Sequence, residues 1–266
     1  MRPAFLLQLP HEEHNLKSRR KSPVNLITTE PHNCSIHLRL NILSRLPFFA
    51  GLSREEMEAV NRHFVDVGYE AGETVYQEGD PAERLFVVAD GKVKLMQHGV
   101  NARNVLLDIL TSGEFFGNLA ALGVAAYSDT AQAQIHSCIL SVRSDSFRQI
   151  LNDHPELAFK SLQIMAQRLE AANRRVLQLS SMPLEKRIAV TLLQLVRKIG
   201  RQTEDMLLIN TPLSRDELAE MTGATPETVS RVMSQWQNEG LIESGRQWVG
   251  VTNLKALEGL AAEELK

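Results

Sequence analysis

The chain has only two cysteines, Cys34 and Cys138, among its 266 residues. Two cysteines cannot build a disulfide scaffold, and they cannot supply the four thiolates that an iron–sulfur cluster usually needs. A four-cysteine cluster is therefore excluded, and any metal site would need histidine or carboxylate ligands.

Long apolar runs are also missing. The longest, such as LAALGVAAY, are far shorter than the roughly 20 residues that a membrane helix needs. The opening MRPAFLLQLPHEEH is too short, and becomes charged too soon, for a secretory signal. We therefore expect a cytoplasmic protein with no membrane partner.

An excess of positive charge is absent as well, because the formal net charge is -3. Proteins that coat nucleic acid indiscriminately rely on a broad surplus of Lys and Arg. Sequence-selective binding through a small local patch is still compatible with this charge. The hydrophobic content of 43% at this length predicts a folded protein of two domains.

Four segments follow one another along the chain. Residues 1–37 show no convincing period and are predicted to be a disordered extension, or the product of a start codon placed too early. Residues 38–154 begin with a helical pattern and then alternate in short runs broken by glycines, which predicts a β-roll. Residues 155–182 predict one long helix and a hinge, and residues 183–266 a C-terminal domain that opens with a further helix.

The long helix carries an apolar seam with alternating spacings of four and three residues. A second copy of the helix is its natural partner, so we expect a homodimer. The alternative is that the stripe covers the β-roll, but the strict seam and the length favour pairing. The seam consists of Ala158, Leu162, Met165, Leu169, Ala172, Val176 and Leu179.

The run LSRDELAEMTGATPETVSRVMSQW predicts two short helices joined by a tight turn. Ser214 and Glu217 have the spacing of a capping box, and Gly223 lies in the turn. Thr225 and Pro226 open the second helix. A buried stripe in that helix is formed by Val229, Val232, Met233 and Trp236.

The outward side of the second helix is the candidate reading surface. In the DNA major groove Arg bonds guanine, Glu accepts from cytosine and Ser bonds either partner. A plain surface helix with a Glu227–Arg231 ion pair is the alternative. After it, LIESGRQWVGV predicts a hairpin wing with Ser244 and Gly245 at its tip. The candidate DNA contacts are Thr225, Pro226, Glu227, Thr228, Ser230, Arg231 and Gln235, with Arg246 of the wing on phosphate.

Three motifs carry a resemblance to a known family: PFFAGLS, GEFFGNLAAL and SRDELAEMTGATPETVSRVMSQWQNEGLI. With the order roll, long helix and winged helix-turn-helix over about residues 40–255, the chain resembles the cyclic-AMP receptor/FNR (Crp/Fnr) family of bacterial transcription regulators. The resemblance implies an α+β fold with a jelly roll like that of cyclic-nucleotide-binding domains. It implies a regulator rather than an enzyme.

Within that family the pattern E-x-x-S-R, here Glu227, Ser230 and Arg231, resembles the FNR type. This implies half-sites close to TTGAT, whereas the cyclic-AMP receptor type would carry Arg in place of Pro226. Two-fold symmetry predicts an inverted repeat with half-sites about 34 to 36 Å apart. The implied partners are double-stranded DNA, a second copy and RNA polymerase. Activation is the working assignment, although the position of a site relative to its promoter decides it.

Relatives that bind a cyclic nucleotide hold it with a Gly-Glu pair and an Arg-Ser/Thr-Ala run. Here Asn118 stands in place of that Glu, and Asp129 in place of the Arg would repel a phosphate. Cyclic AMP is therefore disfavoured as the effector. The degenerate pocket comprises Gly117, Asn118, Leu119, Asp129 and Thr130.

Other signals stay open. YSDTAQA resembles the nitric-oxide-responsive, haem-linked branch, so haem is a candidate beside an unknown small molecule or control by abundance alone. A metal is the weaker reading, because its candidates lie in the predicted extension or, like Cys138, in a strand where a buried cysteine is ordinary packing. These candidates are His32, Cys34, His37, His136 and Cys138.

Two other classes of function compete. A metal-dependent enzyme on the roll could use His98 and His136, but no three ligands have a recognisable spacing and the helix-turn-helix would be unexplained. A nucleotide-sensing module of a kinase or channel would need a catalytic or membrane segment, which this sequence does not show.

Overall fold

The computed structural model describes residues 23–24, 36–99, 104–117 and 123–262. Most of the predicted extension 1–37 therefore lies outside the described residues, together with four of the candidate site residues. Within the described ranges, no helix combines the length and the apolarity that crossing a bilayer requires. The four undescribed candidates are His32, Cys34, Asn118 and Leu119.

Three short helices lead into the roll. They are α1 (Ile36–Arg45), the 3-10 helix η1 (Pro47–Phe49) and α2 (Arg54–Asn61). The predicted capping box at the start of α2 is present: the Ser53 hydroxyl accepts from the Glu56 N–H at 3.3 Å, and the Ser53 N–H donates to the Glu56 carboxylate at 2.7 Å. These contacts pair N–H groups that the first helical turn would otherwise leave unsatisfied.

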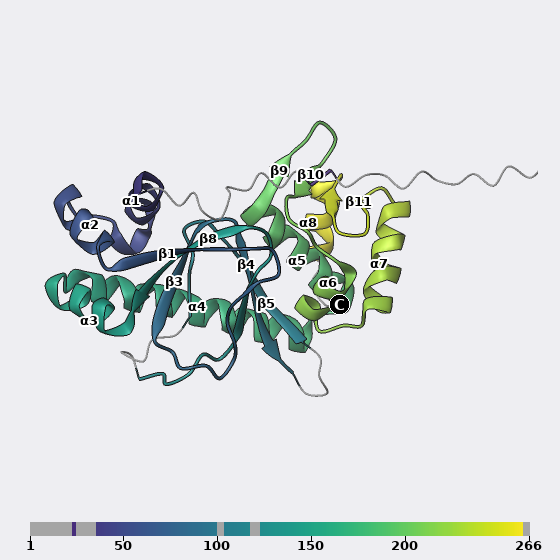
Figure 1. The fold of residues 1–266 in the computed structure, drawn as a ribbon. Helices are drawn as coiled ribbons and strands as arrows, with labels where there is room; N and C mark the ends of the chain where they lie inside the picture. Colours follow the sequence, from purple (N-terminus) through teal and green to yellow (C-terminus); the bar gives the residue numbers. More distant parts are fainter. Residues whose placement is uncertain (1–22, 25–35, 100–103, 118–122, 263–266) are drawn as a thin grey trace, which may run out of the picture.

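The β-roll consists of two four-stranded antiparallel sheets (Figure 1). One has the order β1-β8-β3-β6, and the other has the order β2-β7-β4-β5. This arrangement confirms the predicted roll. The strands are β1 (Phe64–Tyr69), β2 (Thr74–Tyr76), β3 (Arg84–Asp90), β4 (Lys92–His98), β5 (Asn104–Thr111), β6 (Phe115–Phe116), β7 (Thr130–Ala133) and β8 (Ser137–Arg143).

Strand β3 shows how the roll separates two cores. Leu85 and Val87 belong to a cluster on the outer face of the sheet, beneath the surrounding helices. Phe86 and Val88 belong to a second cluster in the interior of the roll. Because successive strand residues point to opposite faces, a strand that is buried on both faces is apolar throughout instead of alternating.

Two helices follow the roll. The first, α3 (Ser144–Asp153), begins where the predicted sheet ends and was not predicted. The second, α4 (Glu156–Ser181), confirms the predicted long helix and, at 26 residues, is about 39 Å long. Of all its residues only Leu157 is buried in the single chain.

The C-terminal part begins with α5 (Leu184–Ile199) and contains a four-stranded sheet of order β11-β12-β10-β9. The wing is therefore larger than the predicted hairpin. The predicted tip is wrong in one respect, because Ser244 pairs with Val249 inside the sheet and the turn runs from Gly245 to Trp248. The remaining elements are β9 (Gly200–Gln202), β10 (Leu207–Ile209), α6 (Arg215–Thr222), α7 (Pro226–Asn238), β11 (Ile242–Ser244), β12 (Val249–Val251) and α8 (Leu254–Ala262).

The C-terminal part packs against strand β5 of the roll. Leu106 and Ile109 share one buried cluster with the core of α5, α6 and α7. Ion pairs flank this contact: Lys94 with Glu217 at 3.0 Å, and Lys198 with Asp108 at 3.0 Å. Nothing in the sequence patterns predicted that the two parts would share a core.

Candidate DNA-binding interface and sensor pocket

Helices α6 and α7 form the helix-turn-helix. The capping box at α6 is present, with Ser214 Oγ accepting from the Glu217 N–H at 3.1 Å and the Ser214 N–H donating to the Glu217 carboxylate at 2.8 Å. Gly223 ends α6 in the left-handed region, with φ 63° and ψ 39°, a conformation that favours glycine. The chain therefore turns at once into α7.

The first turn of α7 is organised by two threonines. Thr225 is the N-cap, and its hydroxyl accepts from the Thr228 N–H at 3.4 Å and lies 3.0 Å from the Thr228 hydroxyl. Both were predicted as DNA contacts, and the structure gives both a capping role. Pro226 occupies the first helical position, where its missing N–H costs nothing.

Helix α7 has the two sides that its sequence predicts. Val229, Val232, Met233 and Trp236 are buried in the core of the C-terminal part. On the other side Glu227, Arg231 and Gln235 are exposed, and Ser230 is half-buried. Figure 1 shows α7 at the outer edge of the C-terminal part. An exposed, rigid helix with polar groups at one-turn spacing has the shape and the donors and acceptors that a major groove accommodates.

The wing stands beside this helix. Arg246 is exposed in the turn between β11 and β12, where its guanidinium is available for a phosphate. Arg215, at the start of α6, donates to the Ser244 hydroxyl at 2.6 Å and so joins the helix-turn-helix to the wing. Burial lowers the pKa of Arg215. Sequence reasoning missed Arg215, because its partner is 29 residues away.

A cleft of about 560 Å³ lies between the start of α7 and the roll. Asn104 and Val105 line it from β5, and Glu220 and Glu227 line it from the helix-turn-helix. Burial, and then the neighbouring Glu217, raise the pKa of Glu220. The beginning of α7 therefore faces the roll of the same chain.

The interior of the roll is filled by aromatic rings. Tyr76 stacks on Tyr127 with centroids 3.9 Å apart, and Phe86 and Phe116 pack beside them. The Tyr76 hydroxyl donates to Asp129 Oδ1 at 2.7 Å. Burial raises the pKa of the Asp129 carboxyl. Sequence reasoning missed Tyr76, although its place in a strand with period-two alternation marked it as facing the interior.

The described members of the degenerate effector pocket do come together around Tyr76. The Gly117 backbone hydrogen-bonds Tyr76, whose hydroxyl also reaches Asp129. Gly117 has φ 84°, and a Cβ there would lie 3.0 Å from the Phe86 ring, so glycine fits this position. The Thr130 hydroxyl accepts from the Glu78 N–H at 3.0 Å. A carboxylate and an aromatic cluster thus occupy this side of the roll.

The metal candidates are not gathered into one site. His136 Nδ1 lies 2.6 Å from a Glu70 carboxylate oxygen, and His98 Nδ1 lies 3.1 Å from Glu78. Cys138 is buried in β8 and is not a free thiol. Across the described part of the chain, no three His, Cys, Asp or Glu side chains are placed to hold one ion. His37 lies in α1, and its side chain is not described.

Comparison with protein families matches two parts of the chain, in the order of the structure. Residues 66–154 match the cyclic nucleotide-binding domain, and residues 186–260 match the Crp-like helix-turn-helix domain. The curated relatives are transcription regulators and not enzymes. The CRP-like cAMP-activated global transcriptional regulator of Mycobacterium tuberculosis is 29% identical over 76% of this chain and 90% of its own length. The cyclic AMP receptor protein of Thermus thermophilus is 29% identical over 81% of this chain and 96% of its own length.

Solved structures show the same architecture. FixK2 from Bradyrhizobium japonicum superposes with a TM-score of 0.66 at 25% identity, over 76% of this chain and 99% of that one. A transcriptional regulator of the CRP/FNR family from Thermus thermophilus has a TM-score of 0.64 at 28% identity, over 75% of this chain and 99% of that one. A cyclic-nucleotide-binding-like roll, a long helix and a winged helix-turn-helix are thus found together in chain order, and the protein belongs to the Crp/Fnr family of DNA-binding transcription regulators.

Proposed function

We propose that the protein is a homodimeric regulator that reads an inverted repeat with TTGAT-like half-sites. The observation that carries this proposal is α7, which buries Trp236 and its apolar neighbours and leaves Glu227, Ser230 and Arg231 on the open side. In a major groove Glu227 can accept a hydrogen bond from cytosine, and Arg231 can donate two to guanine. Ser230 can act as donor or acceptor toward a base. Gln235 and the capping residues of the first turn flank them.

The homodimer is supported by α4. Leu162, Leu169 and Val176 are 65%, 63% and 63% exposed in the single chain, and Met165 is 48% exposed. Apolar side chains that recur on one face of a helix and cover nothing in their own chain are typical of an interface. The alternative is that this stripe covers the roll, but the roll contacts α4 through Arg168 and Arg175, which flank the seam and leave its large side chains exposed.

The seam needs one extension. Phe159 and Leu177 are 74% and 61% exposed and lie beside predicted seam positions, although the heptad pattern did not include them. Ala158 is half-buried, at the end where α4 passes the roll. A pairing surface that includes Phe159 and Leu177 is broader than the predicted stripe of seven residues.

This proposal assigns a different role to each of three segments of the chain. Residues 38–154 would form the sensor, residues 155–182 the pairing helix and hinge, and residues 183–266 the DNA-binding domain. Two α7 helices related by the dimer axis would enter successive major grooves about 34 to 36 Å apart. Arg246 of each wing would contact phosphate, and RNA polymerase is the proposed protein partner.

The signal that we propose differs from the one in the names of the two cAMP relatives. Asp129 places a carboxylate where a cyclic phosphate would need a cation, and this carboxylate accepts a hydrogen bond from the Tyr76 hydroxyl. A negative charge facing a phosphate is repulsive in a partly buried site. Haem stays a prediction.

Fluorescence anisotropy tests the proposal. The purified full-length protein is titrated onto duplexes with a TTGAT inverted repeat, a TGTGA inverted repeat and a scrambled sequence, with and without cyclic AMP, at several salt concentrations. We expect preference for the TTGAT duplex that cyclic AMP does not change. Equal affinity for all three duplexes would overturn sequence-specific reading, and preference for TGTGA only with cyclic AMP would overturn the FNR-type assignment.

A further inference from the structure

A small polar cavity of about 10 Å³ lies where the helices α4, α5 and α6 meet. Arg175 and Gln178 line it from the last turns of α4, Arg187 and Thr191 line it from α5, and Thr222 lines it from the end of α6. About 10 to 15 Å³ of space for the centre of a water-sized sphere is what one water molecule needs. The cavity therefore has room for a single particle of about that size.

Arg175 brings the first of two guanidinium groups to this cavity. It donates through Nη1 to the Leu107 carbonyl at 2.9 Å and through Nη2 to the carbonyls of Leu106 at 3.2 Å and Met221 at 2.9 Å. These bonds leave the Nε–H and one Nη1–H for another acceptor. Burial lowers the pKa of Arg175, although the charge of Asp108 acts in the opposite direction. An anion beside Arg175 would favour its charged form.

The second guanidinium, that of Arg187, is less well satisfied. Its Nη1 donates to the Leu179 carbonyl at 3.4 Å. Its Nε is buried and has no hydrogen-bond partner among the groups that the structure describes. Because an unpaired buried donor is costly, folded proteins usually supply it with a protein group, a water molecule or an ion.

The cavity collects positive charge and hydrogen-bond donors. No carboxylate belongs to the lining, as far as the chain is described. The hydroxyl of buried Thr191 and the amide of half-buried Gln178 can donate as well. A water molecule can accept from the unpaired N–H groups, but it leaves both charges uncompensated. An anion would do both, because it accepts hydrogen bonds and attracts each guanidinium.

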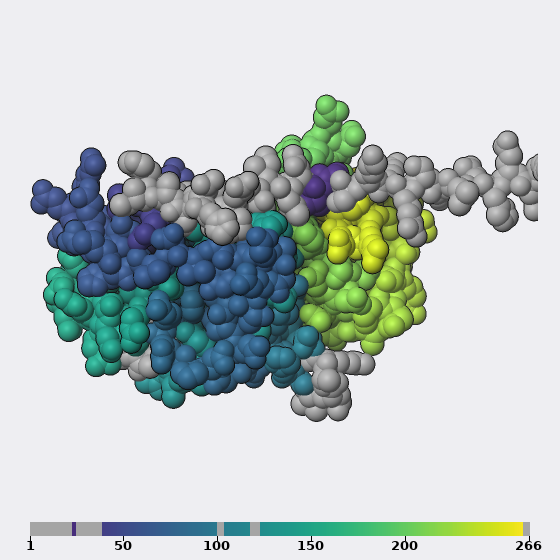
Figure 2. Space-filling model, viewed as in Figure 1, coloured from purple at the N-terminus to yellow at the C-terminus, as the bar shows by residue number. Residues whose placement is uncertain are grey.

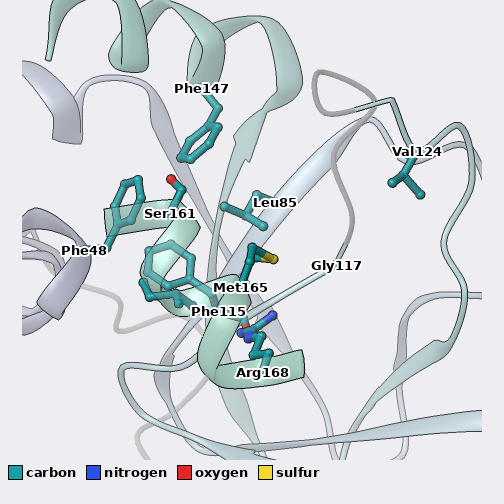
Figure 3. A pocket seen from close by; sticks show the side chains of 10 residues that line it. Phe48, Leu85, Phe115, Gly117, Val124, Phe147, Ser161, Met165 and Arg168 are labelled. Carbon is teal, nitrogen blue, oxygen red and sulfur yellow. The ribbon is translucent and has the colours of Figure 1, made fainter. Parts of the chain in front are cut away.

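A larger cavity beneath α4 shows the contrast (Figure 3). It has about 80 Å³ and a mainly aromatic and aliphatic lining, and Figure 3 shows the Arg168 side chain beside Met165 and Phe115. Gly117 lines it too and also hydrogen-bonds Tyr76, so this cavity adjoins the degenerate effector pocket. An apolar lining offers an inorganic anion few donors, whereas the cavity between α4, α5 and α6 offers several.

We propose that the cavity between Arg175 and Arg187 binds one chloride ion. Chloride is a monovalent anion not much larger than a water molecule, so it fits the volume of about 10 Å³. It accepts several hydrogen bonds at once, which suits a lining of donors from three helices. A tetrahedral oxyanion such as sulfate is too large for this space.

The bound ion would connect the place where α4 ends and α5 begins with the helix-turn-helix. Arg175 holds the Met221 carbonyl near the end of α6. A Cβ on Gly223, in the turn before α7, would lie 3.6 Å from Arg187 Nη1. An ion shared by both arginines would therefore stabilise the packing of α6 on α4 and α5. An effect of chloride on DNA affinity rests on the proposed function, whereas binding of the ion does not.

Thermal unfolding of the full-length protein tests the site. Sodium gluconate is replaced stepwise by sodium chloride at constant ionic strength, so that general screening stays the same. We expect the melting temperature to rise with chloride along a saturable curve, because a ligand that binds only the folded state stabilises it. A melting temperature that does not respond to chloride would overturn the proposal.

Bromide gives a second, direct measurement. It should raise the melting temperature as chloride does, and crystals soaked in bromide should show an anomalous peak between the guanidinium groups of Arg175 and Arg187. Density for water alone at this position, without an anomalous peak, would overturn the proposal.

Three variants sharpen the result. Arg187→Met should weaken chloride binding about tenfold or more, and Thr191→Val, which keeps the shape and removes one donor, about fivefold. Arg174→Met is the matched control and should keep the wild-type response, because Arg174 is an exposed arginine of α4 that pairs with Glu170. The readout is the chloride-dependent change, so a lower melting temperature of a variant in gluconate does not affect it.

Two outcomes in the variants count against the site. A wild-type response to chloride in Arg187→Met would overturn the proposal. A loss of the response in Arg174→Met as well would also overturn it, because the effect would then follow net charge. None of these measurements uses DNA, so their failure is distinguishable from a failure of the anisotropy experiment.

Discussion

Helices α7 and α4 handle their apolar residues in opposite ways. In α7, which has 13 residues, Val229, Val232, Met233 and Trp236 are buried within the chain and the outward side is polar. In α4, which has 26 residues, only Leu157 is buried, and the outward side displays large apolar groups such as Leu162 and Leu169. The space-filling view shows the C-terminal part, which contains α7, as a rounded body beside the roll (Figure 2). The polar residues of α4 include Arg168 and Arg175, which turn toward the roll and donate to its backbone carbonyls.

The two helices differ in whether their apolar side chains are packed within the same chain. Helix α7 is packed by its own chain, so its outward polar groups can select among ligands without affecting the fold. The apolar outer side of α4 gains stability only against another apolar surface, because exposed apolar area is costly in water. In α7 the side chains that stabilise the fold and those that could contact a ligand are different. In α4 the same apolar side chains would do both, by packing against a partner surface.

The largest expected effect comes from charging the seam of α4. The double change Leu162→Glu and Leu169→Glu places carboxylates at the centre of the proposed pairing surface, where burial without a partner is strongly unfavourable. We expect sedimentation velocity to show a monomer in place of a dimer, with an unchanged circular dichroism spectrum. Gln167→Glu adds charge at an exposed position off the seam and should leave the dimer intact. An unaltered dimer in the double variant would show that α4 pairs elsewhere or not at all.

The next largest effect is expected in α7. Trp236→Ala removes a side chain that is 3% exposed and should lower the free energy of unfolding by about 3 to 5 kcal/mol. Gln235→Ala, one residue away on the exposed side, should change it by less than about 0.5 kcal/mol. Urea denaturation measures both. Similar costs for the two variants would contradict the picture of α7 as a helix with one buried side.

Arg231 of α7 should affect which DNA sequence is preferred, whereas Arg246 of the wing should affect the affinity for any duplex. Arg231→Ala should reduce the preference for the TTGAT duplex over the scrambled duplex by about 1 to 3 kcal/mol. Arg246→Ala should weaken binding to both duplexes about equally. It should also reduce the slope of log affinity against log salt concentration by about 1. Anisotropy titrations at several salt concentrations separate these results. A uniform loss in both variants would mean that Arg231 contacts only phosphate.

The smallest effect concerns Asp129, the partly buried carboxyl of the roll that accepts a hydrogen bond from Tyr76. Burial raises the pKa of Asp129 above its ordinary value of 3.8, so the folded protein holds this proton at a higher pH than the unfolded chain. The contribution of Asp129 to the free energy of unfolding is therefore lost as the pH rises through the pKa that this carboxyl has in the folded protein. Asp129→Asn keeps an acceptor for Tyr76 and cannot titrate. The stability of wild type minus that of the variant should fall as the pH rises above about 4, and a constant difference would contradict this.

Local rules explain what the sequence patterns predicted well. The two capping boxes, at Ser53 and Ser214, depend on residues three positions apart, and both are present in the structure. The limits of α4 were predicted because proline flanks both ends, and the turn before α7 because Gly223 suits a left-handed backbone. The stripe of α7 was predicted from helical periodicity alone.

The errors have a common origin in contacts between distant segments. The wing turn was misplaced by one residue because strand pairing between Ser244 and Val249 decides which residues form the turn. Helix α3 was missed because its apolar residues Phe147 and Ile150 are too few to show a period, and packing under the roll stabilises them. Arg215 was missed because Ser244 lies 29 residues further along the chain.

The amino-acid sequence by itself determined the family, the order of the three parts and the polar face of α7, because these depend on periodicity, caps and motifs within short stretches. Only the tertiary structure decided what surrounds Asp129, how β5 shares a core with the C-terminal part and where the cavity beneath α4 lies. Each of these is a meeting of side chains from segments far apart in the chain. Their geometry depends on how whole elements pack, and no local pattern of residues contains that information.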